Sequence, residues 1–512
     1  MIIKIIEYVK KNQKILLLPL GFLGSICSIG RFNMVISIYI WPLCFLFYLH
    51  RCEQKIIPLS IVFGCLFFSN MIRWIGVTSI NVGFDFLIGM YFSIINIIPF
   101  IIDDIVYNKI SKLKSIFIFP LSVAFVEFIF GYIPIANFNI YAYAHLDDLA
   151  FLQIASLFGC YFVSFIIALF TSVFDYSLYI FEKHKEISKI FFLYFAFFVL
   201  LYFFGNTRLI LSNNDKTINV ASALGLSQKL YEEGKNWELP IDSYFSYIES
   251  TMEKANKAGA VMITYAEEAF AIEEDDFQPI VNGVSNYARD KNIFVVLSLD
   301  IHYKNNSNTD TALLISNEGE VLYNYHKQNI IPYTESEYTK WKFDIKRINT
   351  TFGYVGIVIC YDIDFPWFIN SLVKKPIDIL IVPSWDYPGI AEYHSKETRY
   401  RAIEGGFNVI KNTANGIVAA FDVKGRQITY HPGKNCEDYF VITTINNIGF
   451  ETFYSYFEYF INYLYLVGII GILLSGKIMK FLKKKKTNIT SINALNNENN
   501  NAGNNLGLED KE

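Results

Sequence analysis

Charged residues are scarce in this sequence. Only 18% of its 512 residues are Asp, Glu, Lys or Arg, whereas 53% are hydrophobic, and the formal net charge is −4. A chain without an excess of Lys and Arg lacks the basic patch that binds phosphate backbones, so we expect no nucleic-acid partner. Charges are rarest in 15–205 and near 460–476, which favours segments embedded in a membrane.

Cysteine motifs are also missing. The seven cysteines form no CxxC pair and no Cys/His cluster with the spacing of a metal site, so the sequence predicts no metal. Most of them lie in the apolar half, where cysteine usually packs as a small hydrophobe. Only Cys360 and Cys436 lie in the polar half, and the sequence leaves a disulfide between these two open.

Long apolar runs fill the first 210 residues. We predict about eight transmembrane helices, because the runs approach the ~17–25 residues that span a bilayer. The first run follows a lysine-rich segment without a small-residue cleavage site, so we interpret it as a retained helix and not as a cleaved signal peptide. The predicted spans are 15–31, 34–49, 56–73, 82–102, 115–133, 151–174, 189–206 and 460–476.

The placement of Lys and Arg predicts the orientation of these helices. With the N-terminus in the cytoplasm, lysines such as Lys10, Lys109 and Lys183 fall on the cytoplasmic side, whereas the outside loop 134–150 has no Lys or Arg. This is the positive-inside pattern. The predicted parts are a membrane domain with seven spans at 1–210, an extracytoplasmic domain at 215–447, a last transmembrane helix at 458–477, and a basic, then Asn-rich and disordered, cytoplasmic tail at 483–512.

The region 215–447 has a different pattern. Short runs of β-branched and aromatic residues alternate with amphipathic segments, such as 241–258, 274–291 and 391–406. Strands that alternate with helices predict an α/β domain with well-buried sheets.

Three polar residues in this region stand where predicted strands end: Glu267, Lys327 and Cys360. Such ends face the usual ligand crevice of an open α/β sheet. A cysteine on a strand-to-helix turn can act as a nucleophile, a carboxylate can take its proton, and a lysine can lower the pKa of the thiol and stabilise an oxyanion. Each residue alone is weak evidence, because buried cysteines and acids at sheet edges are common. Together they predict an acyl-transfer site.

The motifs around these residues resemble the nitrilase superfamily, the carbon–nitrogen hydrolases. With seven helices before this domain and one after it, the chain is similar to the bacterial apolipoprotein N-acyltransferases. The resemblance implies a polytopic α-helical membrane domain joined to an α/β nitrilase-like domain, which is a four-layer αββα sandwich. The motifs are "ITYAEEAF", "YHKQNIIPYTE", "GIVICYDIDFP" and "RYRAIEGGFNVIKNTANGIVAAFDVKG".

The resemblance also implies a reaction. An acyl chain would pass from a membrane phospholipid to the cysteine as a thioester, then to the N-terminal amine of a diacylglyceryl-cysteine lipoprotein, and no cofactor would be required. The enzyme would be a monomer that crosses the inner membrane several times, with its catalytic domain on the periplasmic side. The resemblance assigns catalysis to Glu267, Lys327 and Cys360, and substrate binding or support to Glu335, Tyr361 and Asp362.

The sequence departs from the acyltransferase motifs near the catalytic positions. Tyr265-Ala266 replaces Trp-Pro before the glutamate, and Asp362 replaces a glutamate after Cys360-Tyr361. Because "CYDIDFP" is closer to the soluble amidases, a membrane-anchored amidase with the same triad is the alternative. A third hypothesis is a transporter or receptor with an inactive nitrilase-like domain; the filled triad and the absence of a sequence repeat argue against it.

A few charges lie in or near the predicted spans. Arg73 and Asp85 stand near helix ends, whereas Glu127 lies deeper, where charge is costly and often functional. We expect Glu127 either to take part in function or to meet a polar partner between helices.

Overall fold

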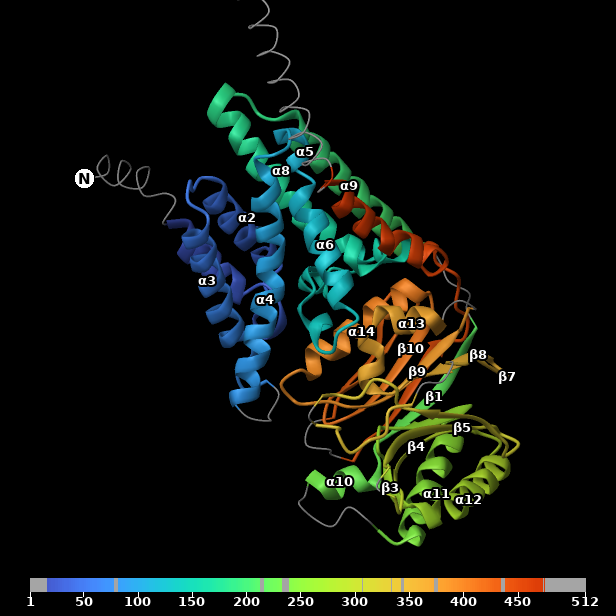
Figure 1. Cartoon of the computed structure of the whole chain (residues 1–512). Coiled ribbons are helices and arrows are strands. Elements are labelled where there is room, and N and C mark those ends of the chain that lie inside the picture. Colours follow the sequence, from blue (N-terminus) through green and yellow to red (C-terminus); the bar gives the residue numbers. More distant parts are fainter. Residues whose placement is uncertain are drawn as a thin grey trace, which may run out of the picture.

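The computed structural model places a bundle of apolar helices on top of an α/β domain (Figure 1). The predicted tail 483–512 and Cys436 lie outside the residues that the structure describes. Those residues are 16–77, 82–211, 216–232, 239–305, 307–332, 334–341, 345–372, 376–433, 438–472 and 474.

All eight predicted apolar runs form helices, but they differ in length. Within the described residues, six helices are long and apolar enough to cross a membrane, whereas Leu16–Ile26 and α2 (Ser37–His50) are shorter. The predicted count of about eight spans is therefore not confirmed. The six are α3 (Ile56–Trp74), α4 (Val82–Tyr107), α5 with α6 (Lys112–Ser115 and Ile118–Phe130), α8 (Ala155–His184), α9 (Lys189–Ile210) and Phe453–Ile472.

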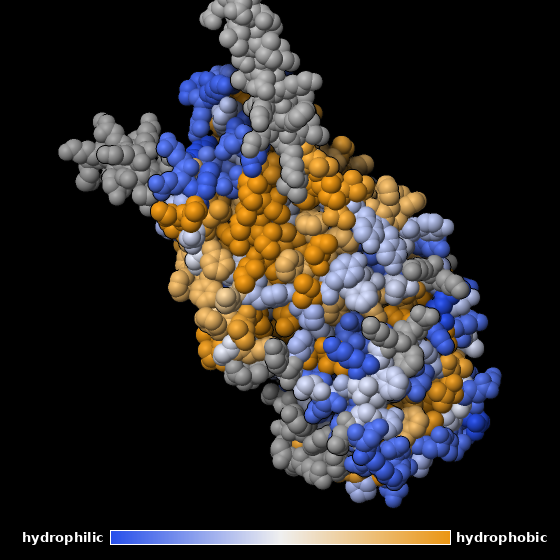
Figure 2. Space-filling view, viewed as in Figure 1, coloured by the Kyte–Doolittle hydropathy of each residue, from blue (hydrophilic) through white to orange (hydrophobic). Residues whose placement is uncertain are grey.

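The surface of the bundle suits contact with lipid. Figure 2 shows a broad hydrophobic area over the helices and a mixed, more polar surface over the α/β domain. Large apolar side chains of α9, such as Phe192, Leu193 and Phe203, are exposed on the bundle. Exposed apolar areas of this kind mark surfaces that contact a membrane or another protein. Together with helices long enough to cross a bilayer, they indicate a membrane protein.

Two β-sheets form the centre of the α/β domain. One has the order β13-β1-β2-β4-β5-β6 with β3 paired to β4, and the other has the order β12-β11-β10-β9-β8-β7. The first contains β1 (Thr217–Ala223), β2 (Met262–Tyr265), β3 (Phe270–Glu273), β4 (Phe294–His302), β5 (Thr309–Ile315), β6 (Val321–His326) and β13 (Phe440–Asn446). The second contains β7 (Ile348–Thr350), β8 (Gly353–Ile357), β9 (Ile379–Trp385), β10 (Asn408–Ala414), β11 (Ile417–Phe421) and β12 (Gln427–Pro432).

Side chains alternate across the first sheet with the period of two that strands require. Val220 and Met262 share a core cluster with Ile357 of the second sheet, whereas Ala221 and Ile263 pack against helices. Both faces are therefore apolar, which explains the near-continuous hydrophobic runs in the sequence. The predicted αββα sandwich is confirmed: its outer layers are α11 (Ile241–Lys257) and α12 (Phe277–Lys291) on one side, α13 (Pro366–Leu372) and α14 (Ala391–Gly405) on the other.

Helix α14 joins the α/β domain to the bundle. It packs on β10 and β11 from one side and on α8 from the other. Its buried Arg401 pairs with Glu404 at 2.5 Å, and Glu404 also accepts the Cys160 N–H of α8 at 2.6 Å. The Tyr400 hydroxyl donates to the Ala142 carbonyl at 2.6 Å. The second sheet is thus held directly against the membrane helices.

Two of the carboxylates noted in the sequence organise loops at this face of the bundle. Glu127 is 7% exposed and accepts the Tyr141 N–H at 2.7 Å. Asp85 accepts the Gly76 N–H at 2.7 Å. Glu127 therefore anchors the turn that contains η2 (Ala136–Asn139) and η3 (Tyr141–His145).

Gly159 breaks α8 near its start. Its φ is +78°, in the left-handed region, and a Cβ at this position would lie 2.4 Å from the ring of Tyr454. Tyr454 is fully buried at the start of the last long helix. Glycine alone combines this φ with this close approach, so α8 and the C-terminal helix depend on it to pack.

Gly159→Ala should destabilise the protein by about 1–3 kcal/mol, because it adds both backbone strain and a steric clash. Thermal unfolding in detergent measures the effect. Gly64→Ala in α3 is the matched control, since no atom lies within 4 Å of a Cβ there and alanine favours a helix. The Gly64→Ala midpoint should stay level or rise; equal midpoints for the two variants would contradict this packing.

Candidate active site

Three strand ends from both sheets meet at one place. Glu267 follows β2, Lys327 follows β6, and Cys360 follows β8 after two residues. All three side chains are buried, with 2–3% of each residue exposed. The charges of Glu267 and Lys327 both act on the Cys360 thiol, so the structure brings the predicted triad together.

The Lys327 ammonium lies between two carboxylates. Its Nζ donates to Glu267 Oε1 and to Glu335 Oε1, each at 2.6 Å. Glu335 is fixed in turn, because its Oε2 accepts the Ile331 N–H at 2.9 Å. A third carboxylate, Asp310 on β5, lies 3.7 Å from Nζ. Burial alone would lower the pKa of Lys327, but Glu267 and Glu335 outweigh it and raise that pKa well above its usual range, so the lysine stays charged.

Cys360 stands on a tight turn. Its φ is +44°, which is unusual for a residue with a side chain, and it begins the short helix η5 (Cys360–Asp364). Strain of this kind collects at functional sites. The cysteine is free, so the structure holds no disulfide at the nucleophile position. Its Sγ donates to the Trp385 carbonyl at 3.7 Å.

The net shift of the thiol pKa is upward, although the sequence predicted a lowering by Lys327. Burial raises the pKa of the Cys360 thiol well above its usual range, and Glu267 raises it further. Lys327 does lower this pKa, as predicted from the sequence, but its effect is outweighed. For this sulfur to act as a nucleophile, the thiol would have to lose its proton, and the Glu267 carboxylate, whose charge acts on the thiol, could accept it.

The two residues after the cysteine have different environments. The Tyr361 hydroxyl accepts the Ile135 N–H at 2.5 Å and therefore contacts the loop after α6. Asp362 is fully buried, and its carboxylate accepts from the Tyr325 hydroxyl at 2.6 Å, from the N–H and side-chain amide of Asn329 at 2.8 Å and from the Ile359 N–H at 3.2 Å. Asp362 thus braces the turn, and burial raises its pKa to about 6.

A buried charged cluster behind the turn was not predicted from the sequence. His394 on α14 lies 2.7 Å from Asp386 and 2.8 Å from Asp364, and Lys411 on β10 lies 2.7 Å from Asp386. Burial would raise the pKa of Asp386, but Lys411 and His394 hold it at about 2. Asp386 follows β9 as Glu267 follows β2, so the strand-end rule could have found it. A lysine inside the apolar strand "NVIKNTA" was the other signal.

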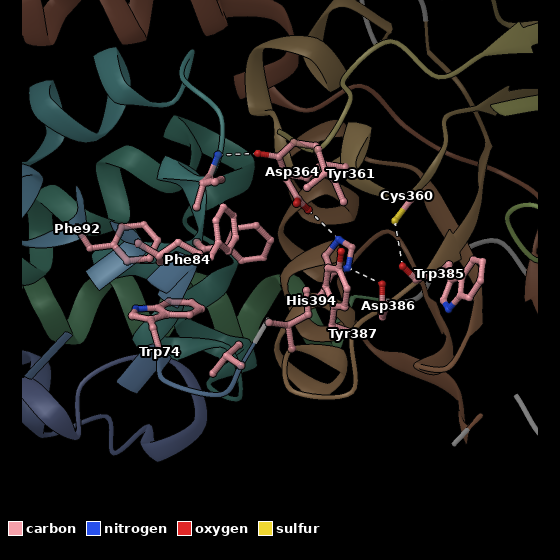
Figure 3. Close-up of a pocket in the computed structure, with 16 residues that line it drawn as sticks. Trp74, Phe84, Phe92, Cys360, Tyr361, Asp364, Trp385, Asp386, Tyr387 and His394 are labelled. Carbon is pink, nitrogen blue, oxygen red and sulfur yellow. Dashed lines mark hydrogen bonds and ion pairs between the residues drawn. The ribbon is translucent and has the colours of Figure 1, made fainter. Parts of the chain in front are cut away.

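An apolar cavity extends from the thiol into the membrane helices. It holds about 680 Å³ of empty space. Figure 3 shows Cys360 and Trp385 at one end and Trp74 and Phe92 at the other. Its walls are Trp74, Val77, Phe84, Ile88, Phe92, Ile135, Phe138, Ile331, Cys360, Tyr361, Asp364, Trp385, Asp386, Tyr387, Ile390 and His394.

A second, polar cavity of about 1490 Å³ lies on the other side of the triad. Glu267 and Glu335 line it, and it shares Ile331, Trp385 and Tyr387 with the apolar cavity. Within the part of the chain that the structure describes, no three His, Cys, Asp or Glu side chains are grouped to hold a metal ion. The site therefore contains a thiol and carboxylates that are suited to nucleophilic and acid–base chemistry. It lies between the apolar cavity and the polar cavity.

The membrane helices and the α/β domain each match a known protein family. The carbon–nitrogen hydrolase family matches residues 217–436, and the apolipoprotein N-acyltransferase N-terminal domain matches residues 20–173. The chain belongs to the apolipoprotein N-acyltransferase family.

Relatives of both kinds are similar to the chain. The apolipoprotein N-acyltransferase of Pasteurella multocida is 20% identical over 86% of this chain and 91% of its own length. The deaminated glutathione amidase of Dictyostelium discoideum is 28% identical over 27% of this chain; that match spans only 52% of the amidase. An amidase from Nesterenkonia sp. AN1, solved in complex with acrylamide, has 16% identity and a TM-score of 0.39 over 46% of this chain and 92% of its own.

Within the apolipoprotein N-acyltransferase family, the Cys-Tyr-Asp sequence of this chain has a local explanation. The shorter Asp362 side chain is fully occupied by Tyr325 and Asn329. This departure from the usual glutamate therefore leaves the triad geometry intact, because the aspartate is a brace inside the domain.

The pH dependence of Cys360 alkylation tests the electrostatics of the site. With iodoacetamide and peptide mass as readout, modification should be slow near pH 7 and should rise only above the ordinary thiol pKa of about 8.5. Glu267→Gln should move the rise to lower pH because it removes a negative charge. Lys327→Met should move it to higher pH because it removes a positive charge.

The other cysteines provide an internal control, since neither substitution should change the alkylation of Cys52. A wild-type rise below pH 8, or one profile shared by all three proteins, would contradict the raised pKa of the Cys360 thiol.

Proposed function

We propose that the protein is a membrane-integral N-acyltransferase that moves an acyl chain from a phospholipid, through a thioester on Cys360, to the N-terminal amine of a diacylglyceryl-cysteine lipoprotein. Family membership supports the reaction class. The roles of the individual residues are inferred from their geometry.

The observation that carries the proposal is the composition of the apolar cavity. Cys360 opens into a space whose far walls are Trp74 of α3 and Ile88 and Phe92 of α4. Burying a fatty chain there would be favoured by ~0.8 kcal/mol for each methylene. A small polar substrate would gain little from such walls, whereas the acyl chain of a lipid matches their apolar character.

The first half-reaction forms the thioester. Glu267 takes the thiol proton as the sulfur attacks the ester carbonyl of the phospholipid. The lysine ammonium has three donors, two of which are held by Glu267 and Glu335, and the third can stabilise the oxyanion. Collapse breaks the ester C–O bond, and Glu267 returns the proton to the departing lysophospholipid oxygen.

The second half-reaction forms the amide. The neutral α-amine of the acceptor attacks the thioester carbonyl, and Glu267 takes the amine proton. Collapse breaks the C–S bond and the proton returns to the sulfur. The apolar walls exclude water, which would otherwise hydrolyse the thioester. No metal or organic cofactor enters this sequence.

The proposed setting is the inner membrane, with the chain acting as a monomer. The positive-inside pattern supports a periplasmic position for residues 215–447. There the apolar cavity would face the outer leaflet of the inner membrane, where both lipid substrates reside.

A membrane-anchored amidase is the second candidate, because the polar cavity beside Glu267 and Glu335 is large enough for a soluble amide. The two activities differ in product: an amidase releases an amine or ammonia and consumes no phospholipid.

Transfer should depend on the sulfur and on its base. Cys360→Ser should lower acylation of a diacylglyceryl lipopeptide by about 10⁴-fold or more, and Glu267→Gln by about 10²–10⁴-fold. Mass spectrometry of the lipopeptide in phospholipid–detergent micelles measures this. Cys52→Ser is the control and should keep wild-type activity. Full activity of Cys360→Ser, or amide hydrolysis without lipopeptide acylation, would contradict the proposal.

Chain-length preference should follow the cavity. Ile88→Trp fills the end of the cavity near α4, so it should reduce transfer from long-chain donors more than from short-chain donors, by several-fold. Ile94→Trp is the matched control, because Ile94 is 42% exposed on the same helix and lines no part of this cavity. An equal loss for all chain lengths would contradict the assignment of the cavity.

A further inference from the structure

Arg73 in the last turn of α3 and Arg31 beside the same helix end have no carboxylate partner among the residues that the structure describes. Arg73 is 3% exposed, and within the described residues no Asp or Glu lies within ion-pair distance of Arg73 or Arg31. Arg51, at the opposite end of the bundle, is different, because it pairs with Asp175 at 3.1 Å and with Glu182 at 3.2 Å. The charge on Arg73 is therefore buried without a counter-ion.

The hydrogen bonds of these arginines are incomplete. Arg73 donates to the Ser28 hydroxyl at 3.4 Å and to the side-chain oxygen of Asn70. Its Nε is buried and has no acceptor. Arg31 donates to the Ile72 carbonyl at 2.6 Å, which places a second guanidinium beside the same helix end. The buried Arg73 guanidinium therefore has an N–H group, at Nε, that is free to donate to a ligand.

Both arginines line one small hollow, with about 250 Å³ of empty space that includes open solvent, which we call the outer arginine site. Trp74, Val77 and Ile390 also line it, and these three side chains are walls of the apolar cavity as well. In Figure 3, Trp74 lies at the end of that cavity away from Cys360. The site thus adjoins the membrane side of the cavity, not the reacting sulfur.

A purely structural role does not balance the cost of this arrangement. A cation in the last turn of a helix stabilises the helix only weakly, whereas burying an ion without a counter-ion is strongly unfavourable. An anion bound in the hollow would offset the unfavourable free energy of burying the Arg73 charge. Phosphate matches the guanidinium fork, which can donate two parallel hydrogen bonds.

We propose that the outer arginine site binds the phosphate group of a membrane phospholipid and so docks the lipid at the entrance of the apolar cavity. Lipid phosphate is the anion available at this depth, because Arg73 ends a membrane-type helix whose lipid-facing neighbours Phe68 and Ile72 are exposed. The inference rests on the membrane position of the proposed function, not on its chemistry.

Lipid binding to the full chain in detergent tests the site. In a Cys360→Ala background, which cannot turn over, native mass spectrometry would compare dioleoyl phosphatidylglycerol with dioleoylglycerol, which has the same chains but no phosphate. Arg73→Gln should weaken phospholipid binding at least about tenfold and leave dioleoylglycerol unchanged. Arg31→Gln should weaken it less, and Arg73→Lys should recover part of the affinity because it keeps the charge.

Arg347→Gln is the charge-matched control, since Arg347 contacts the Pro376 carbonyl in the α/β domain; it should bind both lipids normally. Equal phospholipid affinity in Arg73→Gln and its parent, or equal loss of both lipids, would overturn the proposal. Displacement of the phospholipid by millimolar inorganic phosphate would also overturn it, because the site would then not be selective for lipid. Binding is measured without turnover, so failure of the transfer reaction would not affect the result.

Discussion

The buried ammonium of Lys327 between Glu267 and Glu335 is the interaction on which the site depends. A carboxylate and a lysine in a water-excluded position are costly separately and become acceptable as a hydrogen-bonded group. The contacts at 2.6 Å fix the ends of β2 and β6 and the loop that carries Glu335. Removal of Lys327 would leave the carboxylates of Glu267 and Glu335 without their shared cation, so this one ammonium holds the strand ends together.

This cluster sits at the border between two compartments of opposite polarity. The apolar cavity reaches the membrane helices, and the polar cavity opens beside the carboxylates. Helix α14 links the site to the membrane helices. It carries His394 of the charged cluster behind Cys360, and its Arg401 and Glu404 form the contact with α8. A sulfur at this border can receive a chain from one side and an amine from the other while water is kept from the thioester.

Much of this architecture could be predicted from the sequence. The alternation of strands and amphipathic helices, with polar residues at strand ends, was enough to predict that Glu267, Lys327 and Cys360 share one site. Long-range packing was not predictable: Asp310 reaches Lys327 from β5, and Asp386, His394 and Lys411 meet only because β9, β10 and α14 converge. The net direction of the shift in the thiol pKa was also not predictable, because burial depends on the whole fold and outweighs the charge of one lysine. Helix bounds were also misjudged: the first helix ends at Ile26, before the predicted end at 31, and α2 begins at Ser37, after the predicted start at 34.

The covalent intermediate can be detected by the mass of the Cys360 peptide after incubation with a phospholipid that carries an isotope-labelled acyl chain, without acceptor. If the acyl group passes through a thioester, Cys360 should carry one labelled acyl group that neutral hydroxylamine removes and that is lost on addition of a lipopeptide amine. An unmodified Cys360 under conditions where the lipopeptide is nevertheless acylated, or a label on another cysteine, would contradict the thioester mechanism.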